Sequence, residues 1–186
     1  MGKTSFAYEL DTSPFGDIGL AWSQRKSSPY IVRIFLPGGN MTMVETISRS
    51  FPGAVRRSNG AVKRICGQIQ EFMKGNPVDF SLKYLDMSNC SKFQQKVLLE
   101  NRRIQRGMVS SYGRLADKIL IPGGARAVGS ALAGNPFPII IPCHRVISSS
   151  GELSGFGGGL KMKKTLLEME GVGFDSNGKV NKDYFR

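Results

Sequence analysis

Short runs of hydrophobic and β-branched residues occupy the first part of the chain, at residues 6–10, 18–22 and 30–36. The segments between them are rich in residues that favour turns, so this pattern predicts antiparallel strands. From residue 61 to residue 74 the hydrophobic positions recur every three or four residues, and Pro77 follows shortly afterwards. This spacing predicts an amphipathic helix that buries one face. The first part of the chain is therefore expected to be a small α/β domain.

A polar stretch at residues 86–91 separates this part from the second half of the chain. Ser91 is well placed to cap a helix, because hydrophobic residues follow it at helical spacing. These residues are Phe93, Val97, Leu98 and Ile104. We therefore expect an N-terminal domain at residues 1–90 and a second domain at residues 91–172. A C-terminal tail at residues 173–186 completes the chain.

Two further short helices are predicted at residues 111–119 and 125–133. The turn Pro122-Gly-Gly124 joins them, and Gly134 and Pro136 follow the second helix. Two helices joined by a tight turn within a basic segment outline a helix-turn-helix. Many helical hairpins never contact DNA, so this outline alone does not establish a DNA-binding motif.

The helix predicted at residues 125–133 carries mainly small side chains. They include Ala127, Gly129 and Ala131, while Arg126 projects from the first turn. A helix without bulky side chains is able to approach a phosphate backbone closely, and its N-terminal amides suit anions. Close packing against another helix also selects small residues. The sequence of the helix favours neither interpretation over the other.

His144 is the only histidine of the chain and directly follows Cys143. Residues 139–141 are three isoleucines that predict a buried strand ended by Pro142, which places Cys143 where a buried element reaches a surface or pocket. A cysteine becomes a good nucleophile when a nearby base or positive charge stabilises its thiolate. Adjacent Cys and His residues usually have a structural role. Here the flanking prolines, the following Arg145 and the glycine-rich segment at residues 148–159 make a chemical role harder to dismiss.

The glycine-rich segment leads into a helix predicted at residues 160–169. Glycines allow backbone N–H groups to approach a ligand closely, although a flexible surface loop is the alternative. The segment lacks the pattern of a nucleotide phosphate loop. Glu170 lies at the end of the helix, and Gly171 is expected to stop it.

Composition narrows the possible classes of protein. The 186 residues carry a formal net charge of +12, and residues 91–186 contribute +8 of it, which favours a polyanionic partner over a uniformly solvated basic surface. Three cysteines do not make a disulfide framework, and one histidine excludes a His-rich metal site. Residues 1–10 lack the hydrophobic stretch of a signal peptide, and no hydrophobic run is long enough to span a membrane. We expect a cytoplasmic protein, associated with the nucleoid in a prokaryote, without a metal or cofactor and without membrane contact.

Several co-spaced segments carry a resemblance to a known family. Ile141-Pro-Cys-His-Arg-Val146 resembles the active-site signature of the O6-alkylguanine-DNA alkyltransferases, also called methylated-DNA–protein-cysteine methyltransferases. The resemblance extends to Ser111-Tyr-Gly-Arg-Leu-Ala116, Ala125-Arg-Ala-Val-Gly129, Asn135-Pro136, Gly158-Gly-Leu160 and Leu166-Leu-Glu-Met-Glu-Gly171. It is strong from about residue 93 to residue 172 and faint before that. It implies a small ribonuclease-H-like α/β domain followed by a winged-helix-like domain that binds DNA and performs catalysis.

The resemblance also implies roles for individual residues. Cys143 would accept the alkyl group from guanine O6 in one irreversible, single-turnover displacement. His144 would act as its base through a water molecule, and Glu170 would orient and charge the imidazole. Tyr112 would hydrogen-bond the base and assist its rotation. The Val146 carbonyl, together with the carbonyl of Cys143, would accept from the guanine amino group.

The partner implied by the resemblance is double-stranded DNA that contains O6-alkylguanine, bound by a monomer. The target base would be extruded through the minor groove, and Arg126 would fill the space that it leaves. Gly124, Ala127 and Ala131 would lie along the DNA. Asn135 would brace this helix against the active-site segment.

The glycine-rich segment departs from the family pattern at two positions. Phe156 replaces a frequent tyrosine, and Gly157 replaces a frequent serine, although the Gly157 N–H would still reach O6. Some relatives bind zinc through N-terminal Cys and His residues, and that site is not possible with His144 as the only histidine.

Two other functions compete with alkyl transfer. A non-catalytic lesion or DNA binder is consistent with the basic charge and with Arg126. The alkyltransferase-like proteins that bind lesions without repairing them carry Trp at the cysteine position, so Cys143 argues against that class. A Cys-His hydrolase or acyltransferase is the third possibility, but no acyl pocket is indicated.

Overall fold

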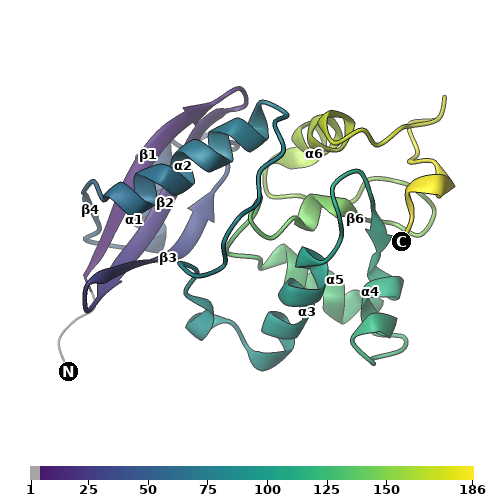
Figure 1. The fold of residues 1–186 in the computed structure, drawn as a ribbon, viewed down its shortest axis with the longest axis horizontal. Helices are drawn as coiled ribbons and strands as arrows, with labels where there is room; N and C mark the ends of the chain where they lie inside the picture. The colour runs from purple at the N-terminus through teal and green to yellow at the C-terminus, as the bar shows by residue number, and fades with distance from the viewer. Residues whose placement is uncertain (1–4) are drawn as a thin grey trace. The chain divides into compact units, whose positions relative to one another are not determined.

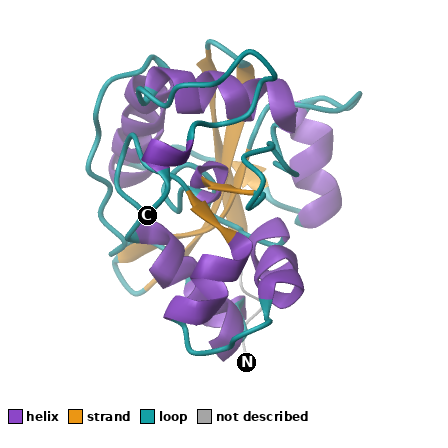
Figure 2. Ribbon diagram, turned by 90° about the vertical axis from the view of Figure 1, so that its right-hand side faces the viewer, coloured by secondary structure: helices purple, strands orange, loops and turns teal. Residues whose placement is uncertain are grey.

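The chain divides into two compact units, Met1–Met87 and Ser88–Arg186, and the computed structural model describes residues 5–186. The boundary between the two units lies between residues 87 and 88. The sequence analysis had predicted it between residues 90 and 91. Residues 173–186, expected as a separate tail, belong to the second unit. The expectation about a signal peptide concerns residues 1–10, of which residues 1–4 lie outside the described part. Figure 1 shows the order of the elements along the chain, and Figure 2 distinguishes helices, strands and loops.

The first unit is built on a four-stranded sheet with the strand order β3-β2-β1-β4. The strands are β1 (Phe6–Ser13), β2 (Gly16–Arg25), β3 (Ser28–Phe35) and β4 (Val55–Arg56). β2 pairs antiparallel with β1 and β3, and β4 pairs parallel with β1. The three predicted strands are confirmed, but they extend into the segments expected to be turns. The β1–β2 turn needs few residues because Gly16 adopts a φ of 118°, a conformation that glycine tolerates without steric cost.

Two helices belong to this unit, α1 (Met43–Ser50) and α2 (Gly60–Met73). α2 confirms the amphipathic helix predicted there, since its hydrophobic positions are all buried and Asn59 caps its N-terminus. Cys66 lies on this buried stripe, where burial raises the pKa of its thiol to about 12. The sequence analysis missed α1, although Thr42 and Glu45 form a capping box at its start.

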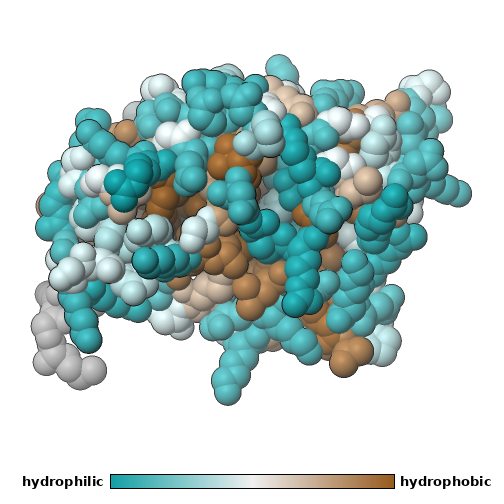
Figure 3. All heavy atoms as spheres, in the orientation of Figure 1, coloured by the Kyte–Doolittle hydropathy of each residue, from teal (hydrophilic) through white to brown (hydrophobic). Residues whose placement is uncertain are grey.

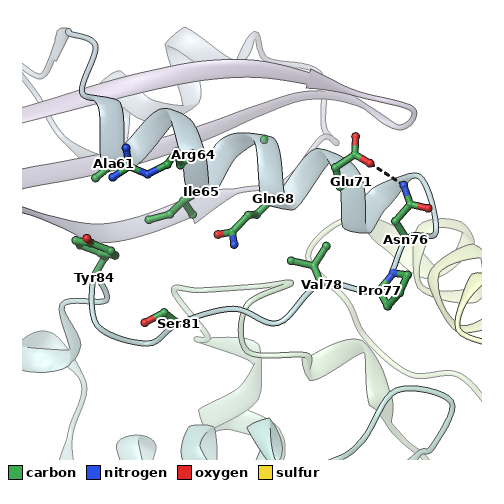
Figure 4. A pocket seen from close by; sticks show the side chains of 11 residues that line it. Ala61, Arg64, Ile65, Gln68, Glu71, Asn76, Pro77, Val78, Ser81 and Tyr84 are labelled. Carbon is green, nitrogen blue, oxygen red and sulfur yellow. Dashed lines mark hydrogen bonds between the residues drawn. The ribbon is translucent and has the colours of Figure 1, made fainter.

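A groove of about 840 Å³ lies between α2 and the segment that follows it, residues 76–84 (Figure 4). Arg64, Gln68 and Glu71 line it from the helix, and Tyr84 lines it from the segment. Every residue that lines this groove belongs to the first unit. None of the residues that the sequence assigns to a functional site is among them.

The second unit is mainly helical. Its elements are η1 (Met87–Asn89), α3 (Lys92–Arg102), β5 (Ser110–Ser111), α4 (Tyr112–Lys118), α5 (Ala125–Ala133), η2 (Cys143–Arg145), β6 (Val146–Ile147), α6 (Gly159–Met169) and η3 (Lys182–Tyr184). Helices α3, α4 and α5 pack against one another, and β5 pairs parallel with β6. Ser91 and Ser111 cap α3 and α4 by accepting hydrogen bonds from backbone N–H groups. The predicted helices are thus confirmed, and α5 has the predicted bounds.

The buried strand predicted at residues 139–141 is wrong, because Ile139 and Ile140 form a turn and Ile141 makes an isolated β-bridge with Pro138. The Ile141 N–H donates to the Phe137 carbonyl at 2.8 Å, and Ile139 adopts a φ of 73°. All three isoleucines are buried, as expected. Pro138 and Pro142 flank the turn and have no N–H to contribute to a sheet. A short hydrophobic run between prolines therefore indicates burial but does not distinguish a strand from a turn.

The C-terminal segment is an integral part of the second unit. The Val109 N–H donates to the Tyr184 carbonyl at 2.8 Å, and the Arg186 N–H donates to the Val109 carbonyl at 2.9 Å. Val180 belongs to a core cluster with Val109, Ile147, Leu167 and Val172. These contacts anchor the strand that leads into α4.

The surface is mainly hydrophilic, as expected from the many charged residues in the sequence. On the face drawn in Figure 3, hydrophilic side chains predominate on both units. Within residues 5–186, no helix combines the length and the hydrophobicity that are required to cross a membrane. The coarse fold is therefore an α/β unit followed by a mainly α-helical one, which agrees with the predicted class.

Candidate active site

Cys143 is the first residue of η2, directly after the buried turn. As a residue Cys143 is half-buried, whereas Cys66 and Cys90 are buried. The Cys143 N–H donates to the Ile141 carbonyl at 2.8 Å, and its own carbonyl accepts from the Val146 N–H. These backbone hydrogen bonds hold the cysteine at the end of a rigid segment.

The surroundings of the Cys143 thiol act on its pKa in opposite directions. Burial raises the pKa, because the protein solvates a thiolate less well than water does. A hydrogen bond from Asn135 and the positive charge of Lys163 both lower it, but burial has the larger effect. The resting thiol is therefore protonated at neutral pH. A reaction at Sγ requires a group that takes this proton.

His144 is fully buried and points away from solvent toward Glu170. Its Nε2 lies 3.0 Å from Glu170 Oε1, and the sequence had predicted that these two residues act together. Burial lowers the pKa of His144, while the hydrogen bond and the charge of Glu170 oppose that shift. With Nε2–H donating to a carboxylate, the other ring nitrogen, Nδ1, carries the lone pair of the neutral imidazole. His144 is therefore an oriented base in the residue that follows the cysteine.

Arg145 completes this network, and the sequence analysis missed its role. Its Nε donates to Glu170 Oε2 at 2.9 Å, its Nη2 donates to Oε1 at 2.8 Å, and its Nη1 donates to the Ile104 carbonyl at 2.6 Å. Burial alone would raise the pKa of Glu170, but the hydrogen bonds and charges of His144 and Arg145 lower it to about 2. Glu170 is therefore ionised at neutral pH, and Arg145 neutralises its charge through two parallel hydrogen bonds.

Lys163 is a second residue that the sequence analysis missed. Its side chain is fully buried, and its Nζ donates to the Val146 carbonyl at 2.7 Å and to the Ser154 carbonyl at 2.6 Å. Burial lowers its pKa to about 8, and a thiolate at Cys143 opposes that shift. Helical spacing gives a signal for its burial, because Lys163 lies on the same face of α6 as Leu166 and Leu167.

Tyr112 is the first residue of α4. Its hydroxyl lies 2.9 Å from the Ser154 Oγ in the glycine-rich loop. Gly129 of α5 packs against the ring, since a Cβ at that position would lie 3.8 Å from the Tyr112 ring carbon Cδ1. The structure thus connects Tyr112 with both the helix pair and the loop.

The glycine-rich loop borders His144. The ring of Phe156 meets the His144 ring edge to face, with 6.2 Å between the ring centroids. Gly157 is exposed, with open space at its Cβ position. A Cβ at Gly158 would lie 2.2 Å from the Met162 sulfur, so a larger residue there would have to displace the Met162 side chain. The loop is therefore packed closely on one side and open on the other.

Asn135 lies between α5 and the turn that precedes Cys143. Its Nδ2 donates to the Ile141 carbonyl at 3.0 Å, and its Oδ1 accepts from the Phe137 N–H at 2.9 Å. These bonds place its amide against the backbone of the active-site segment.

Helix α5 presents Arg126 and Ala127 to solvent, and Gly124 closes the turn before it. A Cβ at Gly124 would lie 2.8 Å from the Ile121 carbonyl oxygen, so the turn requires glycine. Ala131 does not lie on the solvent-exposed side of α5, where it was expected to face the DNA. It is 8% exposed, and its carbonyl accepts from Gln94 of α3 at 3.1 Å, so it lies on the packed side of the helix. The exposed face instead continues through Ser130 and Ala133, which the sequence analysis did not assign.

No metal site was expected from the sequence. Within residues 5–186, no group of three or more His, Cys, Asp or Glu side chains is arranged to hold a metal ion.

Comparison with known proteins supports the resemblance found in the sequence. The profile of the family described as 6-O-methylguanine DNA methyltransferase, DNA binding domain, matches residues 92–172. The methylated-DNA–protein-cysteine methyltransferase of Methanothermobacter thermautotrophicus is 44% identical over 115 residues, which cover 62% of this chain and 64% of that protein. The corresponding protein of Mycobacterium leprae is 45% identical over 112 residues, covering 60% of this chain and 67% of that protein. The matched segment thus spans about two thirds of the length of these relatives.

Solved structures extend the likeness to most of the chain. The crystal structure of the Mycobacterium tuberculosis O6-methylguanine methyltransferase is 34% identical, with a TM-score of 0.71, and the match covers 89% of this chain and 92% of that one. A structure of the same organism's protein in complex with DNA has a TM-score of 0.70 at 34% identity, covering 88% and 92%. The chain therefore belongs to the methylated-DNA–protein-cysteine methyltransferase family.

Proposed function

We propose that this protein repairs double-stranded DNA by transferring the alkyl group of O6-alkylguanine to Cys143. The observation that carries the proposal is that the half-buried Cys143 directly precedes His144, whose ring nitrogen lies 3.0 Å from the carboxylate oxygen of Glu170 in a buried pair. Membership of the family supports the same reaction. We further propose that the protein acts as a monomer in the cytoplasm and that each molecule reacts once.

The chemistry is a single displacement at the alkyl carbon. A water molecule passes the thiol proton of Cys143 to His144 Nδ1, and the thiolate then attacks the alkyl carbon. The new S–C bond forms as the C–O6 bond breaks, and the bonding electrons leave with guanine. The proton returns to the guanine anion, which yields guanine and a thioether. A thioether has no proton whose loss would reverse the reaction, so the protein is consumed.

The buried charges would assist each stage of this displacement. Glu170 accepts from Nε2 and stabilises the imidazolium that forms when His144 takes the proton. Arg145 holds the carboxylate in place through two hydrogen bonds. The Lys163 charge favours the thiolate of Cys143 over the thiol. Burial keeps these interactions strong, because water does not screen them.

The base would be held by groups around the thiol. The carbonyls of Cys143 and Val146 would accept from the guanine amino group, and Tyr112 would donate to the base. The Val146 carbonyl already accepts from Lys163, and its second lone pair is sufficient for the amino group. The exposed Gly157 N–H is the candidate donor to O6, while Phe156 would shield His144 from solvent.

The target atom is inaccessible inside a duplex, so the nucleotide must be extruded. Arg126 at the start of α5 would occupy the vacated space in the stack. The small exposed residues of α5 would follow the minor groove, and positive charge would supply affinity that is independent of sequence. We also propose that the first unit is ribonuclease-H-like and that the second is winged-helix-like, with α4 and α5 as the helix-turn-helix.

A transfer assay tests this proposal. The protein is incubated with a duplex in which the methyl group of O6-methylguanine is radiolabelled, and the protein is then separated under denaturing conditions. We expect label on the wild-type protein and none on Cys143→Ala. DNA binding without label on the protein would contradict transfer and would leave a non-catalytic lesion binder.

A further inference from the structure

A hydrogen bond joins the side chain of Tyr112 to that of Ser154 in the glycine-rich loop. The two hydroxyl oxygens lie 2.9 Å apart, although the residues are 42 positions apart in the chain. Both side chains are partly buried. Each hydroxyl is able to donate one hydrogen bond and to accept another, so the pair forms a directional link.

The backbone of Ser154 is also held in place by a hydrogen bond. Its carbonyl accepts from the buried Lys163 Nζ at 2.6 Å, and the same ammonium binds the Val146 carbonyl at 2.7 Å. Leu153, the preceding residue, packs against the core cluster of Val109 and Leu167. The backbone of Ser154 is therefore held in place within the glycine-rich loop, which limits the positions open to its hydroxyl.

Tyr112 has fewer constraints on its hydroxyl. Ser111 caps the helix that Tyr112 begins, and Gly129 packs against its ring. These contacts limit the position of the ring but do not decide where the phenolic proton points. The bond to Ser154 supplies that constraint.

We propose that Ser154 is a positioning residue for alkyl transfer and that its hydroxyl directs the Tyr112 proton toward the target base. This inference rests on the proposed function, in which Tyr112 donates to the base. When Ser154 donates to the Tyr112 oxygen, the Tyr112 O–H is left to donate to the substrate. A hydroxyl that accepts a hydrogen bond becomes a better donor, because the two bonds polarise one another. Lys163 assists by holding Ser154, and through the Val146 carbonyl it connects this link to the segment that carries Cys143.

A double-mutant cycle tests the link. Single-turnover rates of methyl transfer from an O6-methylguanine duplex are measured for the wild type, Ser154→Ala, Tyr112→Phe and the double variant. A neutral hydrogen bond contributes about 1 kcal/mol, so Ser154→Ala is expected to slow transfer roughly fivefold in the wild-type background. It is expected to cause no further loss in the Tyr112→Phe background, since the phenolic proton that it directs is absent there. A structural role of Ser154 would lower the rate equally in both backgrounds, and that result would overturn the proposal.

Two further variants separate the hydroxyl from the fold of the loop. Ser154→Thr retains a hydroxyl and is expected to recover most of the lost rate. Ser150→Ala removes an exposed serine hydroxyl from the same loop, which bonds Ser148 and Glu152, and is expected to transfer at the wild-type rate. Duplex affinity should be the same for Ser154→Ala and the wild type. A wild-type rate in Ser154→Ala would overturn the inference alone, while absence of transfer in the wild-type protein would overturn the proposed function and this inference with it.

Discussion

Replacing Glu170 by Gln should destabilise the second unit strongly and in a manner that depends on pH. The carboxylate is buried, accepts from His144 Nε2 at 3.0 Å and receives two hydrogen bonds from Arg145. Glutamine has nearly the same shape but no charge. The substitution therefore leaves the buried guanidinium of Arg145 without a counter-charge, which is more costly than the loss of a hydrogen bond between neutral groups.

The size of the effect follows from the pKa of Glu170, which its partners lower from 4.5 to about 2. Each unit of difference in pKa between the folded and unfolded states corresponds to about 1.4 kcal/mol. The ionised carboxylate therefore contributes roughly 3 kcal/mol to the free energy of unfolding. This contribution is complete above about pH 4.5, where the carboxylate is ionised in both states. It is lost as the pH falls toward 2, because the unfolded chain then binds a proton that the folded protein does not.

Urea unfolding, followed by far-ultraviolet circular dichroism between pH 7 and pH 2, measures this difference. Glu168→Gln is the matched control, because Glu168 lies on the same helix but is half exposed and pairs with Lys164 at 3.7 Å. Its removal should change the free energy of unfolding by less than about 1 kcal/mol. The advantage of the wild type over Glu170→Gln should shrink below pH 4.5. An advantage that stays constant with pH, or one no larger than that of the control, would refute the reasoning.

The remaining predictions concern extrusion of the target nucleotide, the buried Lys163 and two turns with a positive φ. Arg126→Ala should slow repair of duplex DNA more than reaction with free O6-benzylguanine, because Arg126 is assigned to extrusion and not to chemistry; equal losses on both substrates would contradict that role. Lys163 has its pKa lowered to about 8, so the unfolded chain binds more protons above that pH, and stability should rise by roughly 3 kcal/mol between about pH 8 and pH 10.5. In urea unfolding, Lys163→Met should lack this rise. If the free energy of unfolding depends on pH in the same way for Lys163→Met and the wild type, the lowered pKa of Lys163 is contradicted. Leu120 is 84% exposed with a φ of 62°, so Leu120→Gly should raise the free energy of unfolding by about 0.5–1 kcal/mol, as the steric penalty exceeds the entropic cost of glycine. Lys26→Gly, at a φ of 53°, should act in the same direction, and a loss of thermal stability in both variants would show that neither turn is strained.

Local signals in the sequence predicted most of the second unit. Ser91 and Ser111 are capping residues followed by hydrophobic side chains at helical spacing, and both helices begin at these caps. The glycine at position 171 adopts a φ of 89°, as a helix stop requires. These features depend on interactions within one turn of the chain, which is why sequence alone suffices to find them.

The parts that were missed depend on distant contacts. Lys163 is buried because two carbonyls from other segments accept its hydrogen bonds. Arg145 binds the carboxylate of Glu170, 25 residues later in the chain. The burial of Ala131 depends on α3 lying beside α5. Helical spacing indicates that Lys163 is buried, but it does not identify the carbonyls that Lys163 binds or the carboxylate that Arg145 binds. The predicted set of residues therefore contained the thiol, the imidazole and the carboxylate but not the two buried cations around them.

The central claim is that Cys143 becomes alkylated, and the intact mass of the protein tests it most directly. The protein is mixed with an excess of duplex containing one O6-methylguanine, and its mass is measured before and after the reaction. We predict that each molecule gains one methyl group in place of the thiol hydrogen, that peptide mapping locates it on Cys143, and that a second addition of duplex causes no further gain. An unchanged mass, or the same gain in Cys143→Ala, would contradict the account.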